Sequence, residues 1–259
     1  MDYKQEISIL VVTHNHDRYI KKLIDSLEKF QYFNVYFCEA ASSDSTLEIL
    51  KTSIFKNNIL VKTKLEGFSK NNNDLIRHFN LNTNFFLLIN PDLYFEEDFI
   101  KTLYESSQKD PNIGIIAPEI HYPDNRLQVT WKKFPSIFQV FKKRLGFLKT
   151  IDEVQMKNNN IDWCIGACML INKVLLKDNN TLLDERYRLY CEDVDICFEA
   201  HQRKLLVVGE KKAVAFHYLN ELSSKKIFSK YNYWNIRSII KFALKWNWKY
   251  FAKKSHKNI

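Results

Sequence analysis

The sequence predicts an α/β fold in which a mostly parallel sheet is covered by helices on both faces. Short apolar runs alternate with helical patterns along the N-terminal half, and a polar turn cluster follows most of the apolar runs. This alternation is typical of parallel strands joined by crossover helices. Ligands of such sheets bind beyond the carboxyl ends of the strands, so the polar clusters are the first candidates for a site.

Two strand–helix units open the chain. Ile7–Val12 is an unbroken apolar run, and beyond the polar turn Thr13–Asp17 apolar residues recur at helical spacing over Ile20–Leu27. Asn34–Cys38 predicts a second strand. Ser43–Lys51 predicts a second helix that begins with Ser and Asp capping residues.

The alternation continues through the middle of the chain. Ile59–Val61 predicts a third strand and Asn71–Phe79 a helix, while the uninterrupted hydrophobicity of Phe85–Ile89 predicts a fully buried strand. Phe99–Gln108 predicts a further helix, and Ile113–Ala117 the strand that follows it.

Beyond residue 117 the periodicity weakens. The stretch up to about Asn160 contains Pro, aromatic residues and mixed charge, so we expect it to be flexible and to face a substrate. Cys168–Ile171 predicts one more buried strand.

Composition limits the class of protein. The 259 residues are 46% hydrophobic, and the longest apolar runs are strand-sized, too short for a membrane-spanning helix. The first residues do not have the layout of a secretory signal. Five cysteines without a CxxC pair favour reduced thiols in a cytosol. Cys164 and Cys168 lack a second ligand pair with spacing suited to zinc.

The excess positive charge lies in the C-terminal tail. Residues 221–259 contain ten Lys or Arg and one Glu, which equals the whole chain's net charge of +9. Within 227–251, apolar residues and lysines recur at helical spacing among Trp and Tyr residues. This pattern suits either a helix lying on an anionic membrane or a helix that packs on the preceding domain.

Seven segments together resemble family 2 glycosyltransferases, and most of all their bacterial rhamnosyltransferase branch. The similarity covers the chain to about residue 222. In chain order the segments are SILVVTHNH (8–16), EAASSD (39–44), GFSKNNN (67–73), LLINPDL (87–93), DWCIGACML (162–170), LDERYRLYCEDVDICFEA (183–200) and AFHYL (215–219).

The resemblance implies the GT-A (nucleotide-diphospho-sugar transferase) fold, with a Rossmann-like central sheet flanked by helices. Residues 1–222 would form the catalytic domain, in which 1–117 bind the nucleotide sugar and 118–222 bind the acceptor and carry the catalytic residues. Residues 223–259 would form a basic, aromatic C-terminal helical segment.

The resemblance also implies a divalent metal, Mn²⁺ or Mg²⁺, that neutralises the donor diphosphate. Asp92 is the leading ligand, at the position of the family's DxD signature. The first carboxylate of that signature is here Asn90, an amide and a poorer ligand. His217 would supply the missing donor, and an imidazole suits Mn²⁺ somewhat better than Mg²⁺.

The catalytic base is expected at Glu192 or Asp193, with Asp193 preferred by its position in the family. One positioned carboxylate suffices for a single, inverting displacement. Adjacent helical residues do not share a face, so only one of the two can point at the substrate. Asp195 would cap the helix or point to solvent. The same acids are also ordinary at the start of a helix, where the helix dipole favours them.

The remaining site residues follow from the resemblance. Glu39 stands where the family usually has Asp, and Ser69 where relatives often have a second Gly. The donor-binding set is Thr13, Glu39, Asp44, Lys70, Asn72, Asn73, Asn90 and Asp92. The acceptor-binding set is Trp163, Gly166, Ala167, Asp184 and Glu185.

These residues predict an inverting, metal-dependent hexosyltransferase with a nucleotide-sugar donor, preferably dTDP-rhamnose, and a glycan or polyprenyl-linked acceptor. We expect it in the cytoplasm, peripheral on the inner face of the membrane, in the synthesis of an O-antigen or capsule. UDP- and GDP-sugars stay open as donors, and a homodimer stays open as the assembly.

Three other classes compete with this prediction. A nucleic-acid-binding protein would explain the pI of 9.1 but would leave the ordered acidic motifs unexplained, so nucleic acid is not an expected partner. A nucleotidyltransferase would need a Gly- and Arg-rich phosphate loop near the first strand. A catalytically dead scaffold is suggested by Asn90 and Glu39 but disfavoured by the intact Asp92 and Asp193.

Overall fold

The structure, a computed structural model, describes residues 2–134, 159–218 and 230–246. Its helices are η1 (Tyr3–Glu6), α1 (Ile20–Lys29), α2 (Thr46–Thr52), α3 (Phe68–His78), α4 (Phe99–Ser107), η2 (Lys173–Leu175), α6 (Glu192–Gln202) and α7 (Lys230–Lys245). Its strands are β1 (Ile7–Thr13), β2 (Val35–Ala40), β3 (Ile59–Lys62), β4 (Phe85–Ile89), β5 (Leu93–Tyr94), β6 (Ile113–His121), β7 (Leu127–Gln128), β8 (Trp131–Lys132), β9 (Trp163–Cys164), β10 (Cys168–Asn172) and β11 (Leu206–His217).

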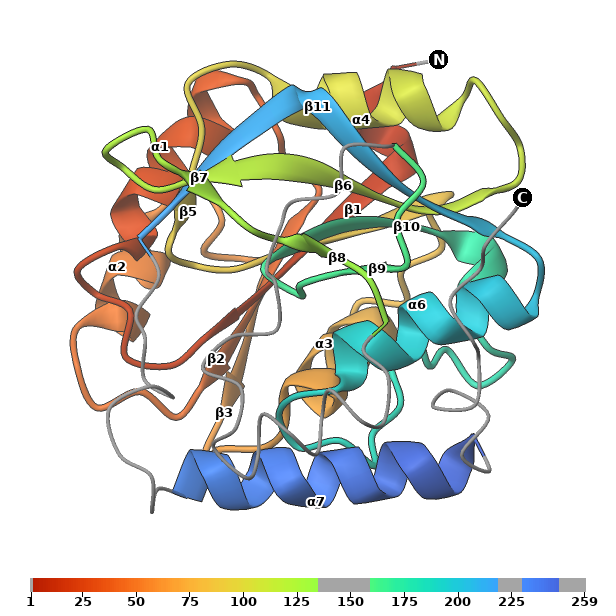
Figure 1. Cartoon of the computed structure of the whole chain (residues 1–259). Helices are drawn as coiled ribbons and strands as arrows, with labels where there is room; N and C mark the ends of the chain where they lie inside the picture. The colour runs from red at the N-terminus through yellow and green to blue at the C-terminus, as the bar shows by residue number, and fades with distance from the viewer. Residues whose placement is uncertain (1, 135–158, 219–229, 247–259) are drawn as a thin grey trace.

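The central sheet has the order β3-β2-β1-β4-β10-β6-β11-β5, and β7 pairs with β6 (Figure 1). Neighbours run parallel from β3 to β4, and β6 is parallel to β11. Strand β10 lies antiparallel between β4 and β6, and β5 is antiparallel to β11. Strands β8 and β9 form a separate two-stranded sheet.

Helices cover both faces of the sheet, as the alternation predicts. One buried cluster joins alternate side chains of β1 and β4 to α1, α2 and α4. A second cluster joins the opposite side chains of the same strands to α3 and α6. The strand period of two thus divides the apolar side chains between two helical layers.

The antiparallel strand β10 places a turn against the end of β4. Cys168 pairs with Ile89, so the residues just before β10 lie beside those just after β4. The N–H of Asn90 donates to the carbonyl of Ala167 at 2.8 Å. Segments far apart in the sequence therefore meet at the carboxyl edge of the sheet.

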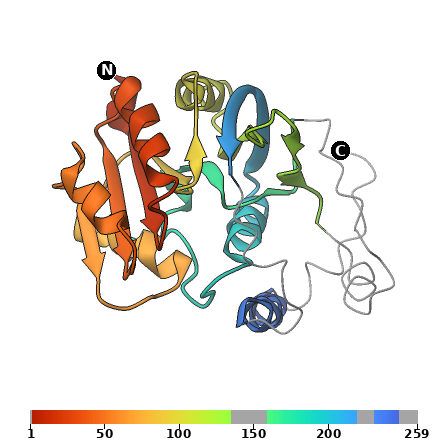
Figure 2. The same cartoon turned by 90° about the vertical axis from the view of Figure 1, so that its left-hand side faces the viewer.

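Helix α7 lies beneath α6 at the edge of the molecule (Figures 1 and 2). Phe242 is buried and packs edge-on against Phe198 of α6, and Trp246 packs against the same ring. Ser238 donates from Oγ to the carbonyl of Leu189 at 3.0 Å. One face of this helix therefore packs on the domain, which was one of the two alternatives for the tail. The rest of 219–259 lies outside the described residues, as do residues 135–158 of the irregular stretch.

Helix α3 begins at Phe68, earlier than the predicted start at Asn71. Its N-cap residue is Gly67, and Asn71 to Asn73 are all buried in its middle. Asn has a low helix propensity and points to a loop when read alone. Here tertiary burial overrides that preference.

Gly209 of β11 provides a test of packing. A Cβ placed on it would lie 2.6 Å from the ring of Trp131, which is fully buried and donates from Nε1 to the carbonyl of Pro118. We expect Gly209→Ala to lower the free energy of unfolding by about 1–3 kcal/mol, because the overpacked ring must move. Urea denaturation measures this. Gly166→Ala is the control, since its Cβ would meet the nearest atom at an ordinary 3.5 Å; an equal loss in both variants would contradict the packing argument.

Candidate active site

The ends of β4 and β11 bring Asp92 and His217 together. His217 is the last residue of β11 and pairs with Leu93, and the N–H of Tyr218 donates to the carbonyl of Asp92 at 3.1 Å. The two side chains then meet, with His217 Nε2 3.1 Å from Asp92 Oδ1. Both are buried.

Gln128 of β7 sets the state of the imidazole. Its Oε1 lies 3.0 Å from Nδ1 of His217, so Nδ1 carries a proton and donates it to the amide oxygen. A neutral imidazole then presents the lone pair of Nε2 to the Asp92 carboxylate. Two electron-rich atoms at this distance need positive charge, supplied either by a second proton on the ring or by a cation bound between the groups.

This arrangement fits a divalent cation with few protein ligands. A carboxylate oxygen and an imidazole nitrogen are both ligands that Mn²⁺ accepts, and Gln128 would orient the ring from behind. Within the described ranges, His, Cys, Asp and Glu side chains form no group of three that could hold a metal. An ion held by Asp92 and His217 would therefore take its other ligands from a bound substrate and from water.

The neighbouring charges favour ionised Asp92. Burial opposes ionisation, but the hydrogen bond and charge of His217, followed by the charge of His16, hold the pKa of Asp92 below its usual value. Burial in turn lowers the pKa of His16. The Asp92 carboxylate is thus ionised near neutral pH, and a bound cation would take the place of the second proton on the His217 ring.

Asp193 lies at the start of α6, facing the turn before β10. Its Oδ2 accepts a hydrogen bond from the N–H of Gly166 at 3.0 Å, and Oδ1 accepts from the N–H of Val194 at 2.8 Å. Gly166 is adjacent to Ala167, which is bonded to Asn90. A continuous set of backbone contacts therefore connects Asp193 to the segment that carries Asp92.

Asp193 and Glu192 differ in their surroundings. Burial raises the pKa of Asp193, which makes this partly exposed carboxylate a better proton acceptor. Glu192 is buried, and its Oε2 has no hydrogen-bond partner. Only Asp193 of the pair combines contact with the Gly166 turn and access from outside.

The backbone is strained immediately before these acids. Tyr190 and Cys191 have φ values of 69° and 71°, the left-handed region that residues with a Cβ seldom adopt. Strain of this kind is kept when the surrounding structure needs a particular side-chain direction. Here it sets the direction in which α6 begins, and so the position of Asp193.

The ends of β1 and β2 form a second polar group. Thr13 and Glu39 are partners in the β1–β2 register, and both are buried. Glu39 accepts from the N–H of Ser42 at 2.7 Å, and Asp44 accepts from the N–H groups of Thr46 and Asp17. The carboxylates thereby fix the two loops that border this end of the sheet.

The buried polar face of α3 is only partly satisfied. Asn73 is fully used, because its Oδ1 accepts from Leu182 and Leu183 and its Nδ2 donates to the Leu183 carbonyl and to Glu185. The Oδ1 atoms of Asn71 and Asn72, in contrast, are buried without a partner. Unpaired buried acceptors are costly, so a ligand that donates to them would stabilise the site.

Comparison with known proteins identifies the family. The domain described as glycosyl transferase family 2 matches residues 8–179. The chain belongs to glycosyl transferase family 2. Rhamnosyltransferase WbbL of Escherichia coli is 23% identical over 250 residues, covering 91% of this chain and 92% of its own length. The N-acetylglucosaminyl-diphospho-decaprenol L-rhamnosyltransferase of Mycobacterium tuberculosis is 23% identical over 120 residues, 42% of this chain and 39% of its own length.

Solved structures show the same fold. The crystal structure of GalNAc-T7 with UDP, GalNAc and Mn²⁺ matches with a TM-score of 0.67 at 14% identity, over 94% of this chain and 48% of that chain. The chain therefore spans about half the length of GalNAc-T7. The predicted GT-A fold and the resemblance to family 2 rhamnosyltransferases are both confirmed.

The structure assembles some predicted residues of this family 2 chain and separates others. Gly166 and Ala167 lie between Asp193 and Asn90. Trp163 lies nearby in β9, with the Lys132 ammonium 5.5 Å from the centre of its ring. Lys70, Asp184 and Glu185 are grouped instead with α7 and the side chains around it.

Asp195 is not a solvated or capping residue, contrary to expectation. It is buried, and it accepts hydrogen bonds from Tyr187 at 3.0 Å, Trp246 at 2.8 Å and Lys245 at 2.5 Å. These three donors satisfy a carboxylate that would otherwise be buried alone. Two of the donors, Lys245 and Trp246, lie about fifty residues after Asp195 in the sequence, outside the motif that contains it.

Sequence reasoning missed Gln128 and His16. Gln128 lies in a stretch without periodicity, and local sequence gives no sign that β7 faces β11. His16 lies within the polar turn Thr13–Asp17 that follows the first strand, and that turn was the available signal. The role of such a glutamine or histidine depends on the residues that it contacts, which are distant in the sequence.

Glu192 gives a test of these electrostatics that needs no substrate. Burial, followed by the charge of Asp193, raises its pKa from 4.5 to about 8. Between these values the unfolded chain is ionised at Glu192 while the folded protein keeps the proton, so stability falls as pH rises. We expect Glu192→Gln to be more stable than the wild type by about 1–3 kcal/mol near pH 7, with the difference disappearing below about pH 4.

Urea denaturation at a series of pH values measures the difference. Glu105→Gln is the matched control, because it makes the same exchange at an exposed side chain. The free energy of unfolding of this variant should differ little from that of the wild type across the pH series. A stabilisation of equal size at pH 4 and pH 7 would show that Glu192 is ionised in the folded protein.

Proposed function

We propose that this family 2 glycosyltransferase is an inverting, metal-dependent enzyme that transfers L-rhamnose from dTDP-rhamnose to a lipid-linked or polysaccharide acceptor. The acceptor would belong to a bacterial surface glycan, an O-antigen or a capsule. The observation that carries the proposal is the contact of Asp92 with His217 at one edge of the sheet, linked through Ala167 and Gly166 to Asp193.

Asp92 and His217 would hold the divalent cation in this proposal. When bound, such an ion neutralises the charge that develops on the donor's diphosphate as the sugar leaves. Gln128 keeps the Nδ1 proton of His217 in place, so Nε2 is the atom available to the cation. GalNAc-T7 was crystallised with Mn²⁺, which supports Mn²⁺ as the first ion to test.

Asp193 would act as the general base. An acceptor hydroxyl must lose its proton as it attacks the anomeric carbon, and a carboxylate whose pKa is raised by burial accepts that proton more readily. A single base beside the reacting carbon is sufficient for one displacement with inversion. Glu192 is buried and would keep its proton near neutral pH, so it would not act as the base.

The remaining donor contacts would come from two groups of residues. Thr13, Glu39 and Asp44 border the ends of β1 and β2, where a nucleoside can lie at the carboxyl edge. Asn90 and the unpaired Oδ1 of Asn72 can accept from sugar or ribose hydroxyls. Asn73 is occupied by the 182–185 segment, so it would order the site rather than contact the donor.

The acceptor would approach from the side of Trp163, Gly166 and Ala167. Rhamnose as the donor sugar is supported by the names of the two rhamnosyltransferase relatives. A lipid-linked acceptor is supported by the diphospho-decaprenol in the name of the mycobacterial relative. Transfer from another UDP- or GDP-sugar is the alternative. Peripheral attachment to the inner face of the membrane, through the basic segment 223–259, belongs to the same proposal; no helix in the described ranges is long and apolar enough to cross a membrane.

A panel of donors tests this function directly. We expect dTDP-rhamnose to raise the melting temperature more than UDP- or GDP-sugars do, and Mn²⁺ to enlarge the effect, because a ligand bound to the folded state stabilises it by mass action. Thermal unfolding of the wild type and of His217→Ala measures both. His121→Ala is the control, since the hydrogen bonds of this imidazole go to Glu119 and to the carbonyl of Asn125 and not to Asp92. A Mn²⁺ effect that persists in His217→Ala would remove His217 from the metal site.

Exchange of Asp193 for Asn tests the base. We expect Asp193→Asn to reduce turnover by at least about 100-fold, because the amide cannot accept the proton. Donor binding, followed by the same thermal shift, should be nearly unchanged. Glu192→Gln is the matched control and should keep most of the turnover; the opposite pattern would assign the base to Glu192.

A further inference from the structure

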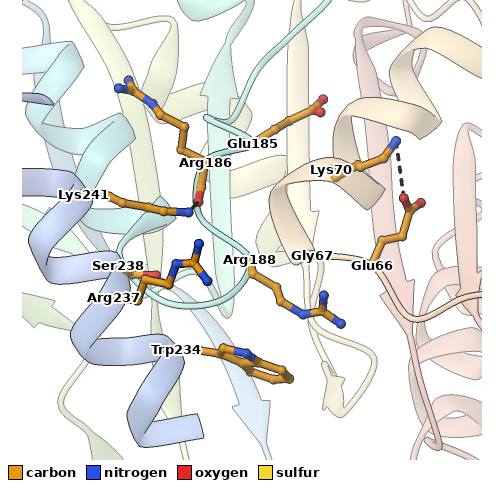
Figure 3. Close-up of a pocket in the computed structure, with 10 residues that line it drawn as sticks. All are labelled: Glu66, Gly67, Lys70, Glu185, Arg186, Arg188, Trp234, Arg237, Ser238 and Lys241. Carbon is orange, nitrogen blue, oxygen red and sulfur yellow. Dashed lines mark hydrogen bonds and ion pairs between the residues drawn. The ribbon is translucent and has the colours of Figure 1, made fainter. Parts of the chain in front are cut away.

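A cavity of about 370 Å³ lies between the start of α3, the segment 185–188 and α7 (Figure 3). Its wall includes Lys70 and Glu66 on the α3 side, and Trp234, Arg237 and Lys241 on the α7 side. Arg188 stands between them, with its guanidinium 4.9 Å from the centre of the Trp234 ring. None of these residues contacts Asp92 or His217, so the cavity is distinct from the candidate metal site.

The cavity carries unbalanced positive charge. Its two carboxylates are already paired, Glu66 with Lys62 at 2.5 Å and Glu185 with Arg77 at 2.7 Å. Among the described residues, Arg188, Arg237 and Lys241 have no carboxylate partner. Their polar contacts are the Leu65 carbonyl, the Tyr233 hydroxyl and the Arg186 carbonyl, respectively.

Three such cations around one cavity suit a phosphate group. Guanidinium groups bind phosphate oxygens in pairs of parallel hydrogen bonds, and a lysine adds a point charge. Figure 3 shows Arg188 between Gly67 and Trp234, and Lys241 beside Arg186, whose carbonyl it contacts. The carboxylates of the wall would not repel an anion strongly, because they belong to a network in which three acids are matched by three cations. Its members are Glu66, Asp74, Glu185, Lys62, Lys70 and Arg77.

An exposed apolar face of α7 adjoins the cavity. Tyr233, Ile236, Ile240 and Leu244 are between 48% and 64% exposed. The first three directly precede the cavity residues Trp234, Arg237 and Lys241, so the two faces are neighbours around the helix. Between Lys230 and Trp246 the sequence contains four Lys or Arg and no acidic residue. An apolar ridge beside a cationic one is the pattern of a helix that lies on an anionic membrane surface.

We propose that the cavity binds the phosphate of a membrane lipid while the apolar face of α7 lies against the adjoining hydrocarbon. This inference deepens the proposed function and rests on it, because a lipid-linked acceptor lies in the membrane to which the cavity and α7 would hold the enzyme. Arg188 belongs to the segment that leads directly into α6, which begins with Glu192 and Asp193. A lipid phosphate held here would therefore lie on the segment that positions the base.

Sedimentation of the full chain with vesicles tests the proposal. The probes are phosphatidylcholine vesicles with about one fifth phosphatidic acid, vesicles of phosphatidylcholine alone, and free inorganic pyrophosphate. We expect strong binding only to the acidic vesicles. Arg237→Glu should weaken it by at least about tenfold, because it removes one cation and adds a repelling charge in the cavity.

Two matched controls separate the cavity from general effects. Lys212→Glu makes the same charge change on the exposed surface of β11 and should leave vesicle binding nearly unchanged. Ile240→Asn should weaken vesicle binding, whereas Val174→Asn should not, although both side chains are 53% exposed. The melting temperature of each variant shows that it is folded.

Other outcomes would overturn the proposal. Equal losses in Arg237→Glu and Lys212→Glu would mean that only net charge matters. Pyrophosphate binding that depends on Arg237, without vesicle binding, would identify a free phosphate compound as the ligand. The donor-induced thermal shift, measured on the wild type and the same variants, separates failure of the proposed function from failure of the lipid site. If no donor shifts the melting temperature of any of them, the proposed function is wrong. The vesicle result alone decides the lipid site.

Discussion

The contact between Asp92 and His217 is the constraint on which the C-terminal half of the sheet depends. Two ionisable side chains are buried side by side, and each would be costly alone. The short pairing of β5 with β11 brings their backbones into register, and Gln128 of β7 occupies the second nitrogen of the imidazole. Three strands from different parts of the chain are thus required to satisfy one acid–imidazole pair.

Strand β10 connects this pair to the rest of the chemistry. It is antiparallel to its neighbours, so its first residue lies at the edge where β4 ends. The turn before it then bonds to Asn90 on one side and to Asp193 on the other. A parallel strand in this position would begin at the opposite edge, and Asp193 would have no backbone support near Asp92.

The sequence was sufficient to predict the N-terminal half of the fold. Short apolar runs identified β1, β2 and β4, and apolar residues at helical spacing identified α1. The polar clusters at the strand ends correctly indicated one edge of the sheet. The predicted start of α3 was wrong, because three consecutive asparagines suggest a loop and their burial cannot be seen in the sequence.

Long-range partners could not be predicted from local patterns. Gln128 has no distinguishing neighbours in the sequence, and Asp195 resembles any acid in the first turn of a helix. Asp195 proved structural because Trp246 and Lys245, fifty residues further on, return to it. Such pairs depend on where α7 packs. Periodicity alone does not decide whether this helix packs on the domain or lies on a membrane.

The network around Asp195 fixes the position of α7 on the domain. Lys245 bridges Asp195 and Asp184, while Trp246 both donates to Asp195 and packs on Phe198. A buried polar network in which each member is satisfied holds a unique arrangement better than apolar packing alone. The inward face of the helix is therefore fixed to α6, the helix that carries Asp193. Its outward apolar face and the cationic cavity beside it are then held at a defined position relative to Asp193, which a loosely attached tail could not achieve.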